Sequence, residues 1–108
     1  MSLNRLSDKL VFNILAGINV GFLEITNYQG EVFKFGNPQD NLKAKLKIKK
    51  PNFSFNLIKG GSIGFAESYM RGEFETDNLS NLIEITARNI KIIYQFSGLL
   101  DFSIINFL

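Results

Sequence analysis

The first hydrophobic pattern in the chain has the spacing of a helix. Apolar side chains recur every three or four residues, at Leu3, Leu6, Leu10 and Ile14. This spacing places them on one face of an amphipathic helix. We therefore expect a helix over residues 3–15, which Gly17 ends.

The middle of the chain has patterns typical of strands. Residues 21–28 and 31–35 are rich in β-branched and aromatic residues and flank a turn sequence, which predicts a β-hairpin. In residues 42–49 apolar residues alternate with lysines, a period of two that suits only a strand. Residues 53–57 alternate large apolar with polar residues. We expect them to pair with 42–49 as an antiparallel hairpin.

Two helices are expected after these strands. Ser62 caps the first, which closes at Gly72. After a short extended link, Thr76 or Asp77 caps a second helix that reaches Phe96. Its apolar stripe comprises Leu79, Leu82, Ile83, Thr86 and Ile90. The element order predicts an α+β fold, an antiparallel sheet of about four to five strands with helices packed on one face.

Composition narrows the class of protein. The chain has 108 residues, which fits one domain, and 45% of them are hydrophobic, as is normal for a globular protein. It has no cysteine and no histidine, which excludes thiolate chemistry and a Ser-His hydrolase triad and disfavours a zinc site. Neither a signal peptide nor a run of about 18 apolar residues occurs, so we expect a cytoplasmic protein.

Four lysines share one side of the predicted strand 42–49 and form what we name the lysine face: Lys43, Lys45, Lys47 and Lys49. Such a face is often simply solvated and resists edge aggregation. It can also dock on anionic phospholipid, each lysine contributing up to ~1 kcal/mol. Nucleic acid is disfavoured, because no aromatic or arginine side chain is interleaved on this face to stack on bases.

Glycines flank a short segment, residues 60–72, which carries one acid, one phenol and one guanidinium. Glu67 and Arg71 lie four residues apart with the acid first, the favourable order for a helical ion pair. They form either a surface pair of little energetic value or a polar group at the mouth of a lipid or domain interface. The glycines favour tight packing over a phosphate-binding loop, because no lysine precedes a hydroxyl residue.

The chain contains 11 phenylalanines, which is many for so small a domain. Most are expected in the core, but they can also line an apolar slot for an acyl chain. The apolar tail from Ile90 onwards either covers the sheet, packs on a second subunit or lies at a membrane interface. The candidate lipid or interface residues are Phe53, Phe55, Phe65, Glu67, Tyr69, Met70, Arg71 and Phe74.

Three blocks of sequence within residues 18–90 form a wider pattern. They are the glycine-bounded segment 21–36, the run from Phe53 through Gly72, and Thr76–Leu79 with Arg88–Asn89. Together they resemble the N-terminal region of the cyclopropane-fatty-acyl-phospholipid synthase family. The resemblance implies a sterol-carrier-protein-2-like α+β domain that precedes a methyltransferase domain, which adds a methylene group from S-adenosylmethionine to phospholipid acyl chains. Phe74 departs from the pattern, because a tryptophan is expected there.

From this resemblance we expect residues 1–108 to be a single lipid-binding-type domain without catalysis or a cofactor of its own. S-adenosylmethionine would belong to the methyltransferase domain, which has no counterpart in this chain. The expected partners are a phospholipid or acyl chain, a methyltransferase domain and the inner face of a membrane. The alternative is a dimerisation or scaffolding module, a homodimer without a lipid site. A small enzyme is disfavoured by the missing histidine, cysteine and cofactor loop.

Overall fold

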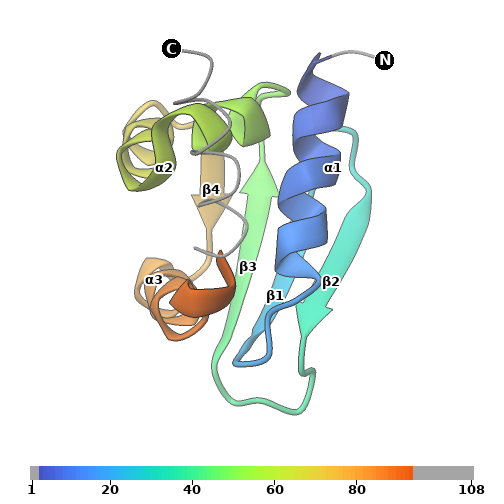
Figure 1. Ribbon diagram of the computed structural model, residues 1–108, viewed down its shortest axis with the longest axis vertical. Helices are drawn as coiled ribbons and strands as arrows, with labels where there is room; N and C mark the ends of the chain where they lie inside the picture. The colour runs from blue at the N-terminus through green and yellow to red at the C-terminus, as the bar shows by residue number, and fades with distance from the viewer. Residues whose placement is uncertain (1–2, 94–108) are drawn as a thin grey trace.

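The computed structural model describes residues 3–93, which form three helices and four strands (Figure 1). The predicted continuation of the last helix to Phe96 is wrong, because that helix ends at Arg88 with Asn89 as its cap. The apolar tail after residue 93 lies outside the described residues. In chain order the elements are α1 (Leu3–Leu15), β1 (Phe22–Thr26), β2 (Val32–Gly36), β3 (Lys43–Ile48), α2 (Phe53–Met70), β4 (Phe74–Thr76) and α3 (Leu79–Arg88).

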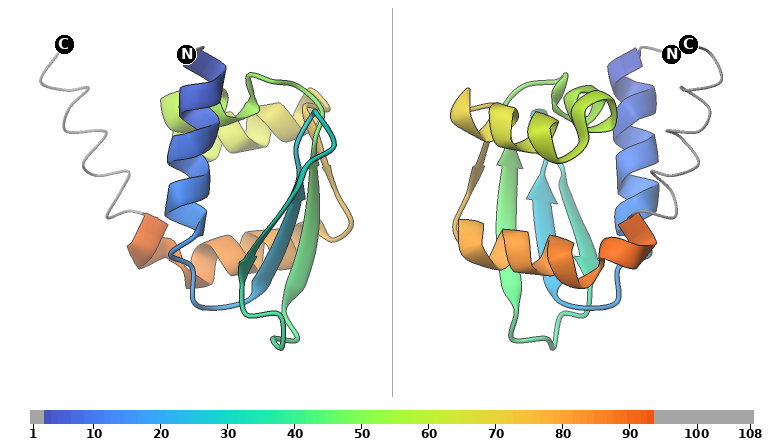
Figure 2. Two further views of the ribbon diagram at one scale, coloured as in Figure 1. Left: turned by 90° about the vertical axis from the view of Figure 1, so that its right-hand side faces the viewer. Right: turned by 60° about the vertical axis from the view of Figure 1, so that its left-hand side comes forward.

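The strands form one sheet in the order β2-β1-β3-β4. All three helices lie on the same face of this sheet, and the opposite face is left open by them (Figure 2). The α+β class with helices on one face is therefore confirmed. The sheet is mixed, not purely antiparallel, because β1 and β3 run parallel while the two outer pairs are antiparallel.

The parallel pairing follows from the path of the loop between β2 and β3. This loop passes under the start of β1, where Asn37 N–H donates to the Gly21 carbonyl at 2.9 Å and Phe22 N–H donates to the Leu42 carbonyl at 2.9 Å. The Asp40 carboxylate accepts from the Gly21 and Leu42 amides at 2.8 and 2.9 Å. These bonds, the Leu42 amide first, hold the pKa of Asp40 below its usual value.

The expected strand at residues 53–57 is wrong, although the strand 42–49 and the hairpin before it are confirmed as β3 and β1–β2. Residues 53–57 begin α2 instead, and the partners of β3 are β1 and β4. The alternation also fits a helix, because Phe53 and Leu57 are four residues apart and both pack on the core. With both edges of β3 occupied, no pairing position remains for this segment.

Helix α2 therefore starts nine residues before the expected cap, Ser62, and it bends at Gly61. Gly61 has φ 56° and ψ −134°, a conformation that only glycine adopts readily. The bend presses Gly64 onto the first half of the helix, where an added Cβ would lie 2.4 Å from the Asn56 carbonyl oxygen. The predicted closure at Gly72 is confirmed, with φ 70° and its N–H donating to the Tyr69 carbonyl at 3.0 Å.

The core lies between the sheet and the helices. Helix α1 has the predicted bounds, but Leu3 is 59% exposed while Ser7 is buried, so the packed face is rotated from the expected stripe. Phe12 of α1 packs against β2, with its ring centroid 4.7 Å from that of Phe33. The buried apolar residues are Ile18, Leu23, Ile25, Ala44, Leu46, Ile48, Phe53, Phe74, Leu82 and Ile85.

Helix α3 also differs in detail from the sequence expectation. Its cap is Asn78, not Thr76 or Asp77, and the Asn78 side chain accepts from the Asn81 amide at 3.0 Å. Ile83 of the expected stripe is exposed.

The last turn of α3 is followed by a buried asparagine, Asn89. Its Oδ1 accepts from the Asn19 and Val20 amides at 3.0 and 3.2 Å, and its Nδ2 donates to the Val20 and Ile85 carbonyls at 2.8 and 2.7 Å. Asn89 thereby ties the end of α3 to the loop that leads into β1.

Candidate membrane-binding surface

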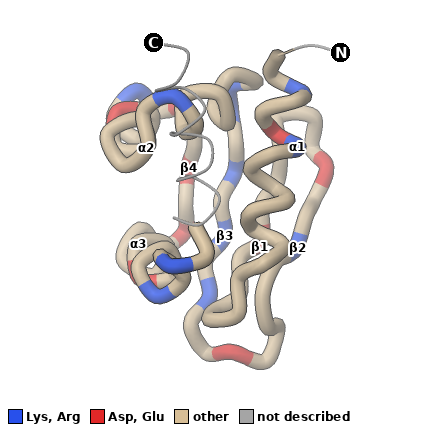
Figure 3. Tube along the Cα trace, in the orientation of Figure 1, with Lys and Arg blue, Asp and Glu red and all other residues tan. Residues whose placement is uncertain are grey.

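Strand β3 places its lysines as the alternation predicted. Ala44, Leu46 and Ile48 are buried against the helices, and the intervening lysines are exposed on the other side of the sheet. Basic residues are accordingly spaced along β3 in Figure 3. The lysine face therefore belongs to the side of the sheet that α1, α2 and α3 leave open.

Strand register adds residues that the sequence pattern of β3 alone did not reveal. Lys34 of β2 and Lys45 of β3 flank Glu24 of β1, which lies in register with both. Phe22 is in register with Lys43, whose Nζ lies 5.9 Å from the centroid of the ring. The expectation that no aromatic residue is interleaved on this side is therefore wrong. We name this surface the open sheet face, formed by Phe22, Glu24, Lys34, Lys43, Lys45, Lys47, Lys49 and Glu75.

Two carboxylates, Glu24 and Glu75, reduce the positive charge of the open sheet face. Glu75 of β4 is in register with Lys47 and forms an ion pair with Lys49, with 2.6 Å between Lys49 Nζ and Glu75 Oε1. The hydrogen bond from Lys49 lowers the pKa of Glu75. Lysines still outnumber glutamates, and the face is cationic.

The aromatic candidates lie mostly in the core. Phe74 is buried, and its ring centroid lies 5.1 Å from that of Phe53, 5.0 Å from that of Phe65 and 5.6 Å from that of Tyr69. Phe55 of α2 is half-buried. The rings of Phe53, Phe65 and Tyr69 pack around the ring of Phe74, which is the arrangement of a filled core.

A depression of about 260 Å³ opens beside α2. It is lined by Asn56, Lys59, Gly60, Ile63, Gly64, Glu67 and Arg71. None of the phenylalanine candidates lines it, and only Ile63 offers a large apolar side chain. This depression is therefore not the apolar slot expected for an acyl chain.

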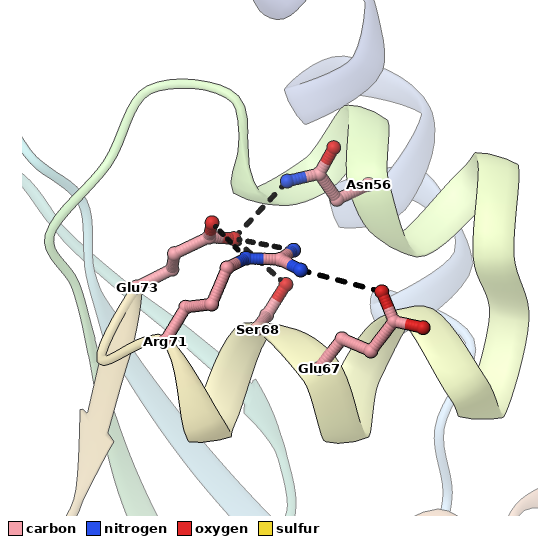
Figure 4. Close-up of polar contacts among 5 residues, drawn as sticks. All are labelled: Asn56, Glu67, Ser68, Arg71 and Glu73. Carbon is pink, nitrogen blue, oxygen red and sulfur yellow. Dashed lines mark hydrogen bonds and ion pairs between the residues drawn. The ribbon is translucent and has the colours of Figure 1, made fainter.

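The predicted ion pair between Glu67 and Arg71 is present, with 3.3 Å between Glu67 Oε2 and Arg71 Nη1. It is part of a larger group that sequence reasoning missed, shown in Figure 4 and named here the Glu73 cluster. Its members are Asn56, Glu67, Ser68, Arg71 and Glu73.

Glu73 is the centre of this cluster, and only 9% of it is exposed. Its carboxylate accepts from Arg71 Nε at 2.8 Å, from Ser68 Oγ at 2.9 Å and from Asn56 Nδ2 at 3.0 Å. Arg71 is the largest cause of a fall in the pKa of Glu73 from 4.5 to about 2, and Ser68 and Asn56 add to it.

The Glu73 cluster assigns Arg71 a structural role. Glu73 first, and Glu67 second, raise the pKa of Arg71 by hydrogen bonding to its guanidinium. With two carboxylates already on the guanidinium, Arg71 holds the end of α2 to the start of β4. A lipid phosphate would have to displace one of these acids.

Helix α2 also leaves apolar side chains in solvent. Ile63 is 70% exposed and Met70 is 76% exposed, and their spacing of seven residues puts them on one side of the helix. Ala66 lies between them and is exposed as well. Ile63, Ala66 and Met70 form what we name the α2 stripe, and Tyr69 adjoins it.

Within residues 3–93, no helix combines the length and the hydrophobicity needed to cross a bilayer. In the same part of the chain, no three acidic side chains converge to hold a metal ion.

No protein-family model, curated protein or solved structure matches the chain.

Proposed function

We propose that this chain is a non-catalytic lipid-binding domain that contacts a phospholipid surface through the open sheet face. In this proposal it works beside a methyltransferase domain of the cyclopropane synthase type, which supplies S-adenosylmethionine and the chemistry. The observation that carries the proposal is the sheet itself. Helices α1, α2 and α3 cover one face and leave the other open, and on that open face β3 alone exposes three lysines.

The arrangement favours surface contact over extraction of a lipid. The rings of Phe53, Phe65 and Phe74 pack on one another, and the depression beside α2 is lined mainly by polar and glycine residues. A bilayer surface needs neither a slot nor a deep pocket. It needs a broad, exposed face with a charge that complements the headgroups.

The direct test is to purify the chain without detergent and measure its pelleting with phospholipid vesicles, alongside native mass spectrometry. The proposal expects the protein to pellet with vesicles and to be monomeric without bound acyl chains. Failure to pellet with any vesicle would refute lipid binding through a surface. A phospholipid that stays bound through native mass spectrometry would instead indicate an extraction site.

The α2 stripe favours the alternative function, a dimerisation module. Apolar residues exposed along one side of a helix commonly mark a protein contact. An antiparallel second copy would place Ile63 opposite the partner's Met70, with Ala66 permitting close approach. Sedimentation of the chain and of Met70→Glu over a range of concentrations tests this. A dimer that Met70→Glu dissociates, without vesicle binding, would favour the module over the lipid-binding domain.

A further inference from the structure

We infer that the open sheet face recognises the anionic headgroups of a phospholipid bilayer, with Lys34, Lys43, Lys45 and Lys47 as the contact residues. This inference rests on the proposed function and adds the class of lipid and the residues that select it. Lys34 and Phe22 join this surface only through the strand register.

The lysines are spread in two dimensions across the sheet. Alternate residues on β3 stand about 7 Å apart along the strand, and β2 lies two strand spacings, about 10 Å, from β3. Each lysine is a point charge on a flexible stem, without the planar fork of arginine. Such an array fits many separate monoanions on a plane better than one shaped ligand.

The two glutamates argue for a bilayer over a nucleic acid. Glu24 lies between Lys34 and Lys45 in the register, and Glu75 pairs with Lys49, so the cationic rows are interrupted. Lipid headgroups diffuse within the bilayer and can gather around the lysines while avoiding the acids. A nucleic acid strand has phosphates at fixed spacing, so it cannot avoid the acids in this way. Proteins that bind single strands stack several bases on aromatic side chains, whereas Phe22 offers one aromatic contact.

Phe22 suits the edge of such a contact. Its ring lies beneath the Lys43 ammonium and remains partly exposed at the start of β1. Aromatic rings with an adjacent polar or charged group are favoured at the boundary between headgroups and acyl chains. We therefore expect the protein to approach the bilayer most closely at the end of the open sheet face that carries Phe22 and Lys43.

The test compares two triple variants with the same change in net charge. Lys43→Gln, Lys45→Gln and Lys47→Gln together remove cations from the open sheet face. The matched control is Lys9→Gln, Lys59→Gln and Lys91→Gln, which removes exposed cations from the helical elements and the residues that follow α3. Partition is measured on vesicles of phosphatidylcholine alone and of equimolar phosphatidylcholine and phosphatidylglycerol, at low and high salt.

We expect the chain to prefer the anionic vesicles, and high salt to weaken the binding. Each lysine on the face contributes about fivefold, so the face variant loses roughly a hundredfold in partition while the control loses less than about fivefold. Glu24→Gln removes the acid between Lys34 and Lys45 and should raise partition by about fivefold. A gain confined to the anionic vesicles separates this effect from misfolding, because apolar residues exposed by misfolding would raise binding to neutral vesicles as well.

Each other outcome overturns the inference. If the two triple variants lose equally, net charge and not the face controls binding. Equal partition into neutral and anionic vesicles would leave the proposed function standing and remove the headgroup selection. Absence of binding to either vesicle refutes both. Tighter binding of a single-stranded oligonucleotide, lost in the face variant, would assign the surface to nucleic acid.

Discussion

Glu73 offers a test in which pH isolates one buried carboxylate. Its pKa falls from 4.5 to about 2 on folding, chiefly through the hydrogen bond from Arg71, so the ionised form stabilises the fold. A shift of that size corresponds to about 3 kcal/mol at neutral pH. Because 49% of the Arg71 side chain is in water, screening reduces this figure, and we expect about 2 kcal/mol.

The sign of the pH dependence follows from the lowered pKa. Above about pH 5 the carboxyl is ionised in both the folded and the unfolded chain, and its full contribution is present. As the pH falls from there towards 2, the unfolded chain takes up the proton first, and the contribution is lost. Glu73→Gln carries no such charge, so it should be less stable than the parent chain at pH 7 and nearly equal to it near pH 2.

The assay is urea unfolding of the parent chain, Glu73→Gln and Glu67→Gln across this pH range. Glu67 bonds the same guanidinium from a half-exposed position, so its variant is the matched control and should change stability far less. Other acids titrate equally in all three chains and cancel in the differences. A stability difference between parent and Glu73→Gln that stays constant from pH 7 to pH 2 would refute the reasoning.

Three further predictions concern backbone contacts and burial. Asn89→Asp removes both donors to the Val20 and Ile85 carbonyls and should cost about 3 kcal/mol in urea unfolding; a loss below about 1 kcal/mol would contradict the role given to this side chain. Gly64→Ala should lower the thermal midpoint, because its Cβ would meet a backbone oxygen at 2.4 Å, whereas Gly60→Ala meets nothing within 4 Å and should keep or raise it; equal midpoints would refute the close packing. Ser54→Ala should be neutral or stabilise by up to about 1 kcal/mol, since the buried Ser54 hydroxyl has no hydrogen-bond partner among the described residues; marked destabilisation would reveal one.

Local signals account for what the sequence predicted correctly. The strand β3 was predictable because its apolar residues alternate strictly with lysines. Only a strand places all the apolar residues on a buried side and all the lysines in solvent. The turn before β2 was predictable from Asn27 and Gly30: the Asn27 side chain accepts from the Gln29 and Glu31 amides, and Gly30 has φ 87°. Each of these signals is contained within a few residues.

What the sequence did not predict depends on contacts between distant segments. The run 53–57 satisfies both a strand and a helix period, and it is the occupation of both edges of β3 that decides for the helix. The Glu73 cluster needs the bend of α2, which brings Asn56 near Ser68. The only local hint was the position of Glu73, which directly follows Gly72, the glycine that closes α2, and stands two residues after Arg71. Lys34 and Phe22 likewise joined the open sheet face only through register.

The contact made by Asn89 has a consequence for the order in which the chain acquires its structure during synthesis. The Asn19 amide donates to Asn89, which is synthesised 70 residues later. One edge of β1 pairs with β3, which is also synthesised after it. A nascent chain can therefore form α1 and the first hairpin early, but β1 keeps an unpaired edge until β3 emerges. The hydrogen bonds that tie the end of α3 to the loop before β1 form only when α3 and Asn89 have left the ribosome. Until β3 has emerged, the growing chain exposes an edge of its later central strand, where another chain could pair.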